Sequence, residues 1–456
     1  MNTIKKCVFI RAEVRAGLLI FMLLCLGTAL AAQNGGEKGR GDELTLRIAV
    51  MGPGSELYFW WGHIALMIDD AGSGESRFYD YGLFSFETDH FFTNFALGRL
   101  LYSCGVSPSD SNIAGYVRTN RDVKFYTLDL SPEKRAEVRD FAENNVLPEN
   151  RNYFYHHFRD NCATRIRDII DLAIDGRFKE QFGEAPGRFT LRGHVRRHTW
   201  FSPFFDWLLN FLMGQDIDTP ITIWEEMFLP AEIGNRIENF SYVDSEGVTR
   251  RLVSGVETVY RASGRPGVLD VPRRQWPREL AFSLAVSVLI GFFFFLQAKK
   301  CRAGQILVGL SQSLAGLFFG GFGLVLFFMT FFTDHDYTYH NANLFFANPL
   351  LLAALPLGIR YALERDGNRR FLSEALLRLL WLLTALGIFV SMLVKLLPQF
   401  WQQNLTDQML MLPIALVFAL EPSGLHKALV RLRGKIEKKG NPQRNTKERK
   451  GKKEKT

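Results

Sequence analysis

Five long apolar segments follow Pro277, and they constrain this chain more than any other feature of its sequence. They lie near residues 280–298, 304–332, 344–363, 372–396 and 408–420, and runs such as FFFF at 292–295 occur within them. About 20 mostly apolar residues suffice to cross the hydrocarbon core of a bilayer. The sequence therefore predicts an all-α bundle of about five transmembrane helices and excludes a simple soluble enzyme.

Positive charges alternate with these apolar segments. Lys and Arg follow the first segment at 299–302, surround the third loop at 360–370 and fill the chain after the fifth segment, whereas the second and fourth loops hold only Lys395. Cytoplasmic loops of membrane proteins carry such an excess of Lys and Arg. If the residues before the first crossing are exported, five crossings place the C-terminus in the cytoplasm, in agreement with the charges.

The net charge of +8 has its source in the C-terminal tail. From Glu421 onward the sequence has 13 Lys and Arg against 4 Glu, so the rest of the chain is close to neutral. A basic stretch directly after a membrane segment is typical of a cytoplasmic flank beside anionic lipid. We therefore expect a membrane as partner and no nucleic acid.

The N-terminus has the pattern of an export signal. Basic residues precede an apolar run at 16–30, and Ala29–Leu30–Ala31 is a suitable cleavage site, with an uncleaved anchor as the alternative. The predicted domains are a signal peptide or anchor (1–32), a flexible linker (33–43), an exported periplasmic domain (44–277), a transmembrane domain (278–420) and a basic cytoplasmic tail (421–456). This order predicts a multi-pass protein of the bacterial inner membrane.

The exported domain is expected to be α+β. Alternating or β-branched runs predict strands at 44–50, 64–68, 77–81, 100–106 and 123–130, with a turn at 69–76 between the second and third. Ser131 followed by Pro132 predicts the start of one helix, and a second helix begins near Cys162 and ends at Gly176. A late hairpin is expected around 244–247.

Cys162 is the best candidate nucleophile. It opens the second helix, where the free N–H groups and the positive end of the helix dipole favour the thiolate. A thiolate nucleophile needs a base within hydrogen-bond reach, and His63 at the start of a hairpin strand is the best partner. If the turn is centred near 72–73, His63 lies opposite Tyr81 or Gly82, and Asp80 is close enough to orient the imidazole.

Each of these residues also has a structural interpretation. Cys162 is alternatively a buried thiol or one half of a disulfide with Cys104, His63 a hydrogen-bonded core histidine, and Asp80 a solvated acid beside a turn. His194 and His198 are four residues apart, a spacing suited to zinc on a helix. They lack a recognisable acidic third ligand, so we expect a basic surface helix there, no metal and no cofactor.

The context of these residues resembles a known family. The runs are Trp61–Gly62–His63, Phe78–Tyr79–Asp80–Tyr81–Gly82 and YFYHHFRDNCATRIRD at 153–168, with His335, Asn341–Leu344 and Asn348–Leu350 in the membrane half. Together they resemble the bacterial Lnb family of lipoprotein N-acyltransferases over roughly 44–235 and, more loosely, the membrane half. Its wider relatives are circularly permuted papain-like, NlpC-like thiol enzymes, in which a strand His also precedes a helix-start Cys.

The resemblance implies a two-step acyl transfer. Cys162, activated by His63 with Asp80 as third member, would take an acyl chain from a phospholipid as a thioester and pass it to the N-terminal amine of a diacylglyceryl-cysteine lipoprotein. Backbone N–H groups at the helix start are expected to stabilise the oxyanion. The expected substrate-binding residues are Trp60, Trp61, Tyr81, Asn161, Arg165, His335 and Asn341.

Several alternatives stay open at this point. His335 and Asn341 either bind a lipid head group or cap helix ends, and the apolar stretch 201–213 lies either at the membrane interface or in the core of the exported domain. A membrane-anchored cysteine amidase or peptidase acting on wall peptides is the second functional hypothesis. A non-enzymatic membrane scaffold with an inert Cys162 is the third.

Overall fold

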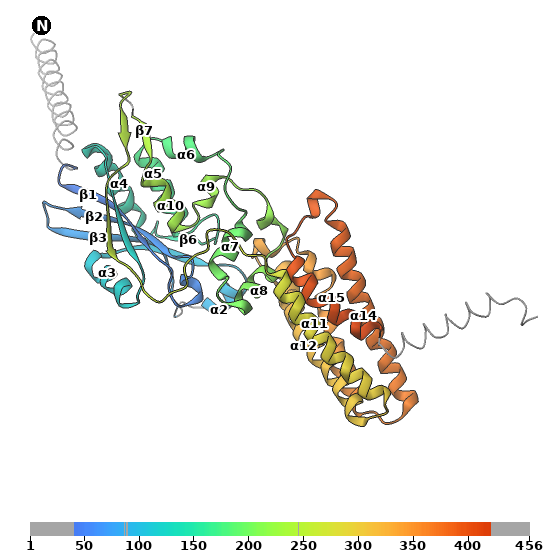
Figure 1. Ribbon diagram of the computed structural model, residues 1–456. Helices are drawn as coiled ribbons and strands as arrows, with labels where there is room; N and C mark the ends of the chain where they lie inside the picture. Colours follow the sequence, from blue (N-terminus) through green and yellow to red (C-terminus); the bar gives the residue numbers. More distant parts are fainter. Residues whose placement is uncertain (1–40, 86, 88–89, 245, 421–456) are drawn as a thin grey trace, which may run out of the picture. The chain divides into compact units, whose positions relative to one another are not determined.

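A computed structural model describes residues 41–85, 87, 90–244 and 246–420 (Figure 1). The chain forms two compact units. The first holds the described residues up to Phe91 with Leu100–Arg188 and Ile221–Arg265; the second holds Phe92–Arg99, Phe189–Pro220 and the described residues from Pro266 onward. The expected leader (1–32), most of the linker and the basic tail (421–456) lie outside the described residues.

The first unit is built on a seven-stranded antiparallel sheet. Its strand order is β6-β4-β3-β2-β1-β5-β9, and a separate hairpin pairs β7 with β8. The strands are β1 (Leu44–Met51), β2 (His63–Asp70), β3 (Glu75–Leu83), β4 (Leu101–Pro108), β5 (Val123–Leu128), β6 (Asn152–Phe154), β7 (Ser241–Val243), β8 (Thr249–Arg251) and β9 (Val253–Tyr260). The five predicted strands and the late hairpin are confirmed, whereas the edge strands β6 and β9 were not predicted.

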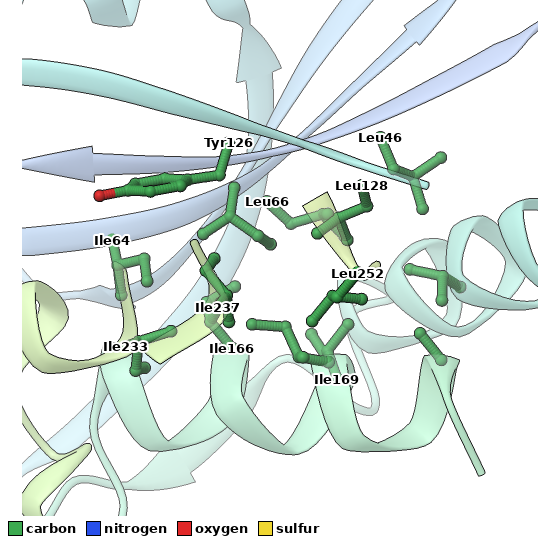
Figure 2. Packing of buried hydrophobic residues seen from close by; sticks show 14 of the residues in the cluster. Leu46, Ile64, Leu66, Tyr126, Leu128, Ile166, Ile169, Ile233, Ile237 and Leu252 are labelled. Carbon is green, nitrogen blue, oxygen red and sulfur yellow. The ribbon is translucent and has the colours of Figure 1, made fainter. Parts of the chain in front are cut away.

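Helices cover both faces of this sheet. On one face, α4 (Pro132–Asn145), α5 (Cys162–Ala173) and α10 (Pro230–Ile237) contact β1 and β2, and on the other α3 (Ser109–Arg118) contacts β3, β4 and β5 (Figure 1). Successive side chains of a strand point to opposite faces of the sheet. Strands β1, β2, β3 and β5 therefore contribute apolar residues to the core on both faces. Figure 2 shows strand residues such as Leu66 and Leu128 packed against Ile166 and Ile169 of α5. The unit is thus α+β, as predicted.

The second unit is helical. Its long apolar helices are α11 (Trp276–Ala298), α12 (Arg302–Phe332), the stretch Ala342–Leu363 that ends in α13 (Ala354–Leu363), and α14 (Gly367–Val394). These four meet the length and composition of membrane spans, whereas the fifth apolar helix, α15 (Leu405–Leu420), has 16 residues. Four of the predicted segments are continuous helices, and the third is formed by the turns at 342–345 and 349–353 followed by α13. Among the described residues only four segments reach spanning length rather than the five expected.

Contacts between α15 and α14 show how far the two helices run side by side. Gln408 Nε2 donates to Ser391 Oγ at 2.9 Å, and near the other end of α15 Phe418 packs on Trp381 with ring centroids 4.8 Å apart. The last charged side chain of α14 before its apolar run is Arg378. Because 16 helical residues extend about 24 Å, α15 is long enough to run along most of the uncharged stretch of α14, and its contacts extend from Ser391 to Trp381.

We therefore still expect five crossings and a cytoplasmic C-terminus. A reporter that is active only outside the cytoplasm, fused after Thr456, should remain silent, and the same reporter fused in the second loop after His340 should be active. Activity of the fusion after Thr456 would leave four crossings as the correct number.

One shorter helix packs on the long apolar helices of the second unit. Trp207 and Phe211 of α8 (Pro203–Leu212) lie in one apolar cluster with α12, and Trp207 stacks on Phe318 at 5.5 Å. The alternative that the stretch 201–213 forms the core of the exported domain is therefore wrong. Packing against a spanning helix explains why this short helix is so rich in aromatic residues.

The expectation of a basic surface helix around His194 is also wrong. Helix α7 (Leu191–Thr199) is mostly buried, and its Arg192 is fully enclosed. The Arg192 guanidinium pairs with Asp218 Oδ1 at 2.7 Å and donates to three backbone carbonyls, those of Asn210, Met213 and Gly214. These partners replace the water that the charge loses, which is the condition under which an arginine can be buried.

The remaining described helices are short. They are α2 (Phe91–Ala96), α6 (Arg177–Phe182), α9 (Ile223–Glu226) and the 3₁₀ turns η1 (Leu57–Phe59), η2 (Gln215–Asp218), η3 (Asp336–Thr338), η4 (Ala342–Phe345), η5 (Pro349–Ala353) and η6 (Pro398–Phe400).

Cys104 and Cys162 are both free thiols, so the alternative of a disulfide between them is wrong. Cys104 is buried in β4, and its Sγ donates to the carbonyl O of Asn145 at 2.8 Å. Because a serine hydroxyl can make the same bond, we expect Cys104→Ser to retain activity and to lose about 1 kcal/mol of unfolding free energy. Chemical denaturation of the purified variant with a parallel activity assay measures both, and a loss of activity with the fold intact would contradict it.

Candidate active site

The start of α5 is fixed by Asn161. Its Oδ1 accepts from the N–H groups of Ala163 and Thr164 at 2.8 and 2.9 Å, and the Thr164 hydroxyl accepts in return from the Asn161 N–H, which completes a capping box. Its Nδ2 donates to the carbonyls of His157 and Phe228. Cys162 therefore lies at the first helical position, as predicted, on a rigidly held helix end.

The β2–β3 hairpin brings His63 and Asp80 together. Ala65 pairs with Asp80, a register that places His63 opposite Gly82, one of the two positions that the sequence predicted. His63 Nε2 lies 2.6 Å from Asp80 Oδ1, and their side chains are 16% and 11% exposed. The carboxylate thus holds one ring nitrogen, which leaves Nδ1 for proton transfer.

Gly62 is needed directly before this strand. Its φ is +81°, and a Cβ there would lie 2.7 Å from the carbonyl O of Met51, which pairs with His63 on β1. Only glycine tolerates both the left-handed backbone and this contact. The backbone of β1 therefore approaches closely at Gly62.

Cys162 lies beside the same end of the hairpin. Gly82 has φ +95° at an irregularity of the β3–β4 pairing, and a Cβ placed on it would be 3.7 Å from Cys162 Cβ. Because Gly82 lies opposite His63 in the hairpin, Cys162 and His63 are both neighbours of Gly82. Asp80, His63 and Cys162 therefore occupy one site.

The pKa of His63 is raised well above its ordinary value. Burial by itself lowers it, but the charge of Asp80, with smaller contributions from Tyr116 and Cys162, outweighs burial and favours the imidazolium. Tyr116 stacks on the ring with centroids 6.2 Å apart. A histidine that keeps its proton beside a thiol suits a thiolate–imidazolium pair.

Removing the Asp80 charge should shift the pH dependence of activity. In Asp80→Asn, burial would dominate and the pKa of His63 would fall, so the imidazolium would be lost at lower pH. We expect the alkaline limb of the kcat/KM profile to move down by at least about one pH unit and the maximal rate to fall about tenfold. An unchanged alkaline limb would mean that His63 does not set it.

The predicted substrate-binding residues of the first unit differ in their surroundings. Trp60 is buried and its Nε1 donates to the Ser55 carbonyl, and its ring lies 6.5 Å from that of Trp61. The Tyr81 side chain is fully buried. The Arg165 guanidinium makes a bidentate pair with Asp160. Arg165 therefore has a structural partner, and substrate contacts stay a prediction for all of them.

His335 and Asn341 belong to the second unit, and both are buried. His335 Nε2 bonds to the Phe95 carbonyl at 3.1 Å and Nδ1 to Tyr337 Oη at 2.9 Å. Asn341 caps η4 and donates to the carbonyls of Phe211 and Leu212. These bonds favour the helix-capping alternative for Asn341 and a structural role for His335.

The structure also changes the expected oxyanion donors. Of the free N–H groups at the start of α5, those of Ala163 and Thr164 are already bound by Asn161 Oδ1. Of the N–H groups expected to stabilise the oxyanion, that of Cys162 is still available, because the first residue of a helix has no intrahelical acceptor.

Sequence reasoning missed three residues around Cys162. Tyr116 and Arg121 come from α3 and the turn after it, and Tyr153 comes from the edge strand β6. Arg121 is buried between the rings of Phe59 and Tyr116, 4.6 and 4.8 Å from their centroids. No local pattern marks them, because only the pairing of distant strands brings them to the site.

The two histidines of α7 bond to protein groups. His194 Nδ1 bonds to Arg197 Nη1, and His198 Nδ1 bonds to the His194 carbonyl. Within the described ranges, no three His, Cys, Asp or Glu side chains are grouped so that they could hold a metal ion.

Comparison with known families gave two matches. Residues 37–196 match the model of the Lnb N-terminal periplasmic domain, and residues 277–420 match that of the Lnb transmembrane domain. Together they span well over half of the 456 residues. The comparisons with curated proteins and with solved structures gave no match.

Proposed function

Because this chain belongs to the Lnb family, as a membrane protein with a periplasmic domain, we propose that it is a cysteine-dependent lipoprotein N-acyltransferase. Its acyl donor is a phospholipid and its acceptor the N-terminal amine of a diacylglyceryl-cysteine lipoprotein. The observation that carries the proposal is the free thiol of Cys162 at a capped helix start beside the His63–Asp80 pair.

In the first step Cys162 becomes acylated. His63 Nδ1 takes the thiol proton, and the sulfur attacks the ester carbonyl carbon of the phospholipid. The tetrahedral intermediate collapses as the ester C–O bond breaks, and the leaving alkoxide takes the proton from His63. The products are a lysophospholipid and a thioester on Cys162. Asp80 stabilises the imidazolium throughout, since its carboxylate holds Nε2 at 2.6 Å.

In the second step the acyl chain moves to the amine. The neutral N-terminal amine attacks the thioester carbonyl, His63 accepts a proton from the attacking nitrogen, and the C–S bond breaks to give the amide and the Cys162 thiolate. A thiolate leaves readily when an amine attacks, so the thioester is a suitable carrier. The proton on His63 then pairs with the regenerated thiolate.

A circularly permuted papain-like fold is part of the same proposal. In support, the strand that carries His63 precedes the helix that Cys162 opens, and that helix packs on one face of an antiparallel sheet. A protein anchored by at least four spanning helices also fits a lipid donor better than a soluble wall peptide, because an acyl chain must leave the bilayer to reach the thiol.

Mass spectrometry tests the proposal. The full chain, purified in detergent, is incubated with phospholipid and a synthetic diacylglyceryl-cysteine peptide. We expect one acyl chain to be added to the peptide amine and an equal amount of lysophospholipid to appear. If the acyl chain is released only as free fatty acid, the protein is a hydrolase. If a wall peptide is cleaved instead, the amidase or peptidase hypothesis is correct.

A further inference from the structure

The tetrahedral intermediate at Cys162 needs a second hydrogen-bond donor. Acyl-transfer sites stabilise the oxyanion with donors already in position, and loss of one donor slows such reactions by about 10² to 10³. At the start of α5 the N–H groups of Ala163 and Thr164 are bound by Asn161. The N–H of Cys162 is thus one donor, and the other must come from outside the helix.

Tyr153 has an unpartnered hydroxyl at this place. The residue is 8% exposed, and its Oη is buried without a hydrogen-bond partner among the described residues. A buried polar group left in this state lowers the stability of the fold. Such a cost marks the hydroxyl as a candidate for a partner that arrives with the substrate.

Gly82 leaves a space between this hydroxyl and the nucleophile. A Cβ placed on Gly82 would lie 3.7 Å from Cys162 Cβ, 3.9 Å from Tyr153 Oη and 3.9 Å from Tyr155 Cε2. All three are ordinary contact distances, so one further heavy atom fits there. An oxygen on a carbon bonded to the Cys162 sulfur is of this size, and from this position it needs to approach Tyr153 Oη by only about 1 Å to accept a hydrogen bond.

The ring of Tyr153 is held rigidly. The Arg165 guanidinium carbon lies 3.7 Å from the ring centroid, and Arg165 is itself fixed by two hydrogen bonds to Asp160, at 2.7 and 3.0 Å. Burial, followed by the charge of Cys162, raises the pKa of Tyr153, so its hydroxyl remains a proton donor. A fixed donor needs no reorganisation as the charge develops.

We propose that the Tyr153 hydroxyl, together with the N–H of Cys162, forms the oxyanion hole, and that Gly82 provides the space for the oxyanion. This inference rests on the proposed thiol chemistry and adds a catalytic residue to it. It also gives Arg165 and Asp160 a positioning role, as the pair that keeps the Tyr153 ring in place.

The test compares two reactions of Cys162 in the full chain in detergent. A p-nitrophenyl ester of a fatty acid acylates the thiol through an oxyanion, whereas iodoacetamide alkylates it without one. We expect Tyr153→Phe to lower the acylation rate about 100-fold at unchanged KM and to leave the alkylation rate unchanged. Tyr126→Phe is the matched control, a buried tyrosine of the same sheet face whose ring lies beside Lys124; both its rates should equal the wild type.

Other outcomes overturn the inference. Wild-type acylation rates in Tyr153→Phe would mean that the hydroxyl does not contact the oxyanion, and an equal fall of both rates would mean that it acts on the thiol or on the fold. If the ester acylates Cys162 with the expected dependence on Tyr153 but phospholipid does not, the oxyanion hole stands and the lipid donor is wrong. If neither ester acylates the wild type, both proposals fail.

Discussion

Replacing Cys162 with alanine is expected to abolish acyl transfer while the protein stays folded and inserted. Asn161 caps α5 through its own side chain, and the Cys162 side chain makes no contribution to that capping box. The helix should therefore start at the same residue, whereas the covalent intermediate cannot form. We expect a loss of about 10⁴-fold or more, to background, measured as N-acylation of lipoprotein termini in cells that carry only the variant.

The acyl-enzyme gives a direct readout for this prediction. Incubated with phospholipid and no acceptor, the wild type should gain one acyl mass on the peptide that contains Cys162, and hydroxylamine should remove it. Cys104→Ser, which changes the other described thiol of the first unit, should acylate normally. Normal lipoprotein N-acylation by Cys162→Ala would show that the thiol is structural.

Replacing His63 with alanine is expected to have nearly as large an effect. Without the imidazole the thiol proton has no acceptor at the site, and the leaving group has no donor, so we expect the rate to fall by about 10³-fold or more. The double variant Cys162→Ala/His63→Ala should be scarcely worse than either single one, because members of one catalytic unit are not additive. Acyl-enzyme formation measured in the three variants checks both expectations.

Additive effects of the two substitutions would contradict the prediction that Cys162 and His63 act as one catalytic unit. If the losses multiply in the double variant, each residue acts separately, and if His63→Ala retains wild-type acylation at its optimal pH, another base serves Cys162. Asp80→Asn should lie between the wild type and His63→Ala, because the imidazole remains and only its charge partner is lost.

The sequence by itself determined the features that depend on neighbouring residues. The turn at 69–76 narrowed the β2–β3 register to His63 opposite Tyr81 or Gly82 with Asp80 nearby, because hairpin register follows from turn position, and the structure selects Gly82. The helix predicted to start near Cys162 does start there, and the structure shows that Asn161, predicted as a substrate-binding residue, caps it. Apolar run length fixed the helices of the membrane half. Each of these signals is local and needs no knowledge of distant residues.

The tertiary structure alone decided which distant residues surround Cys162. The edge strand β6 has three residues and no pattern of its own, so only its pairing with β4 brings Tyr153 to the site. The capping box also took two N–H groups that the sequence assigned to the oxyanion, since a side chain and a substrate compete for the same donors.

Burial was likewise decided by tertiary packing. Helix α7 has the composition of an exposed basic helix, yet Arg192 is fully enclosed because Asp218 and three carbonyls receive its guanidinium. The Asn341 side chain is similarly buried because it donates to two carbonyls at the end of α8. The composition of a segment shows only that burying its polar side chains is unfavourable. The hydrogen-bond partners that make the burial possible come from other segments, so the sequence of the helix alone does not reveal them.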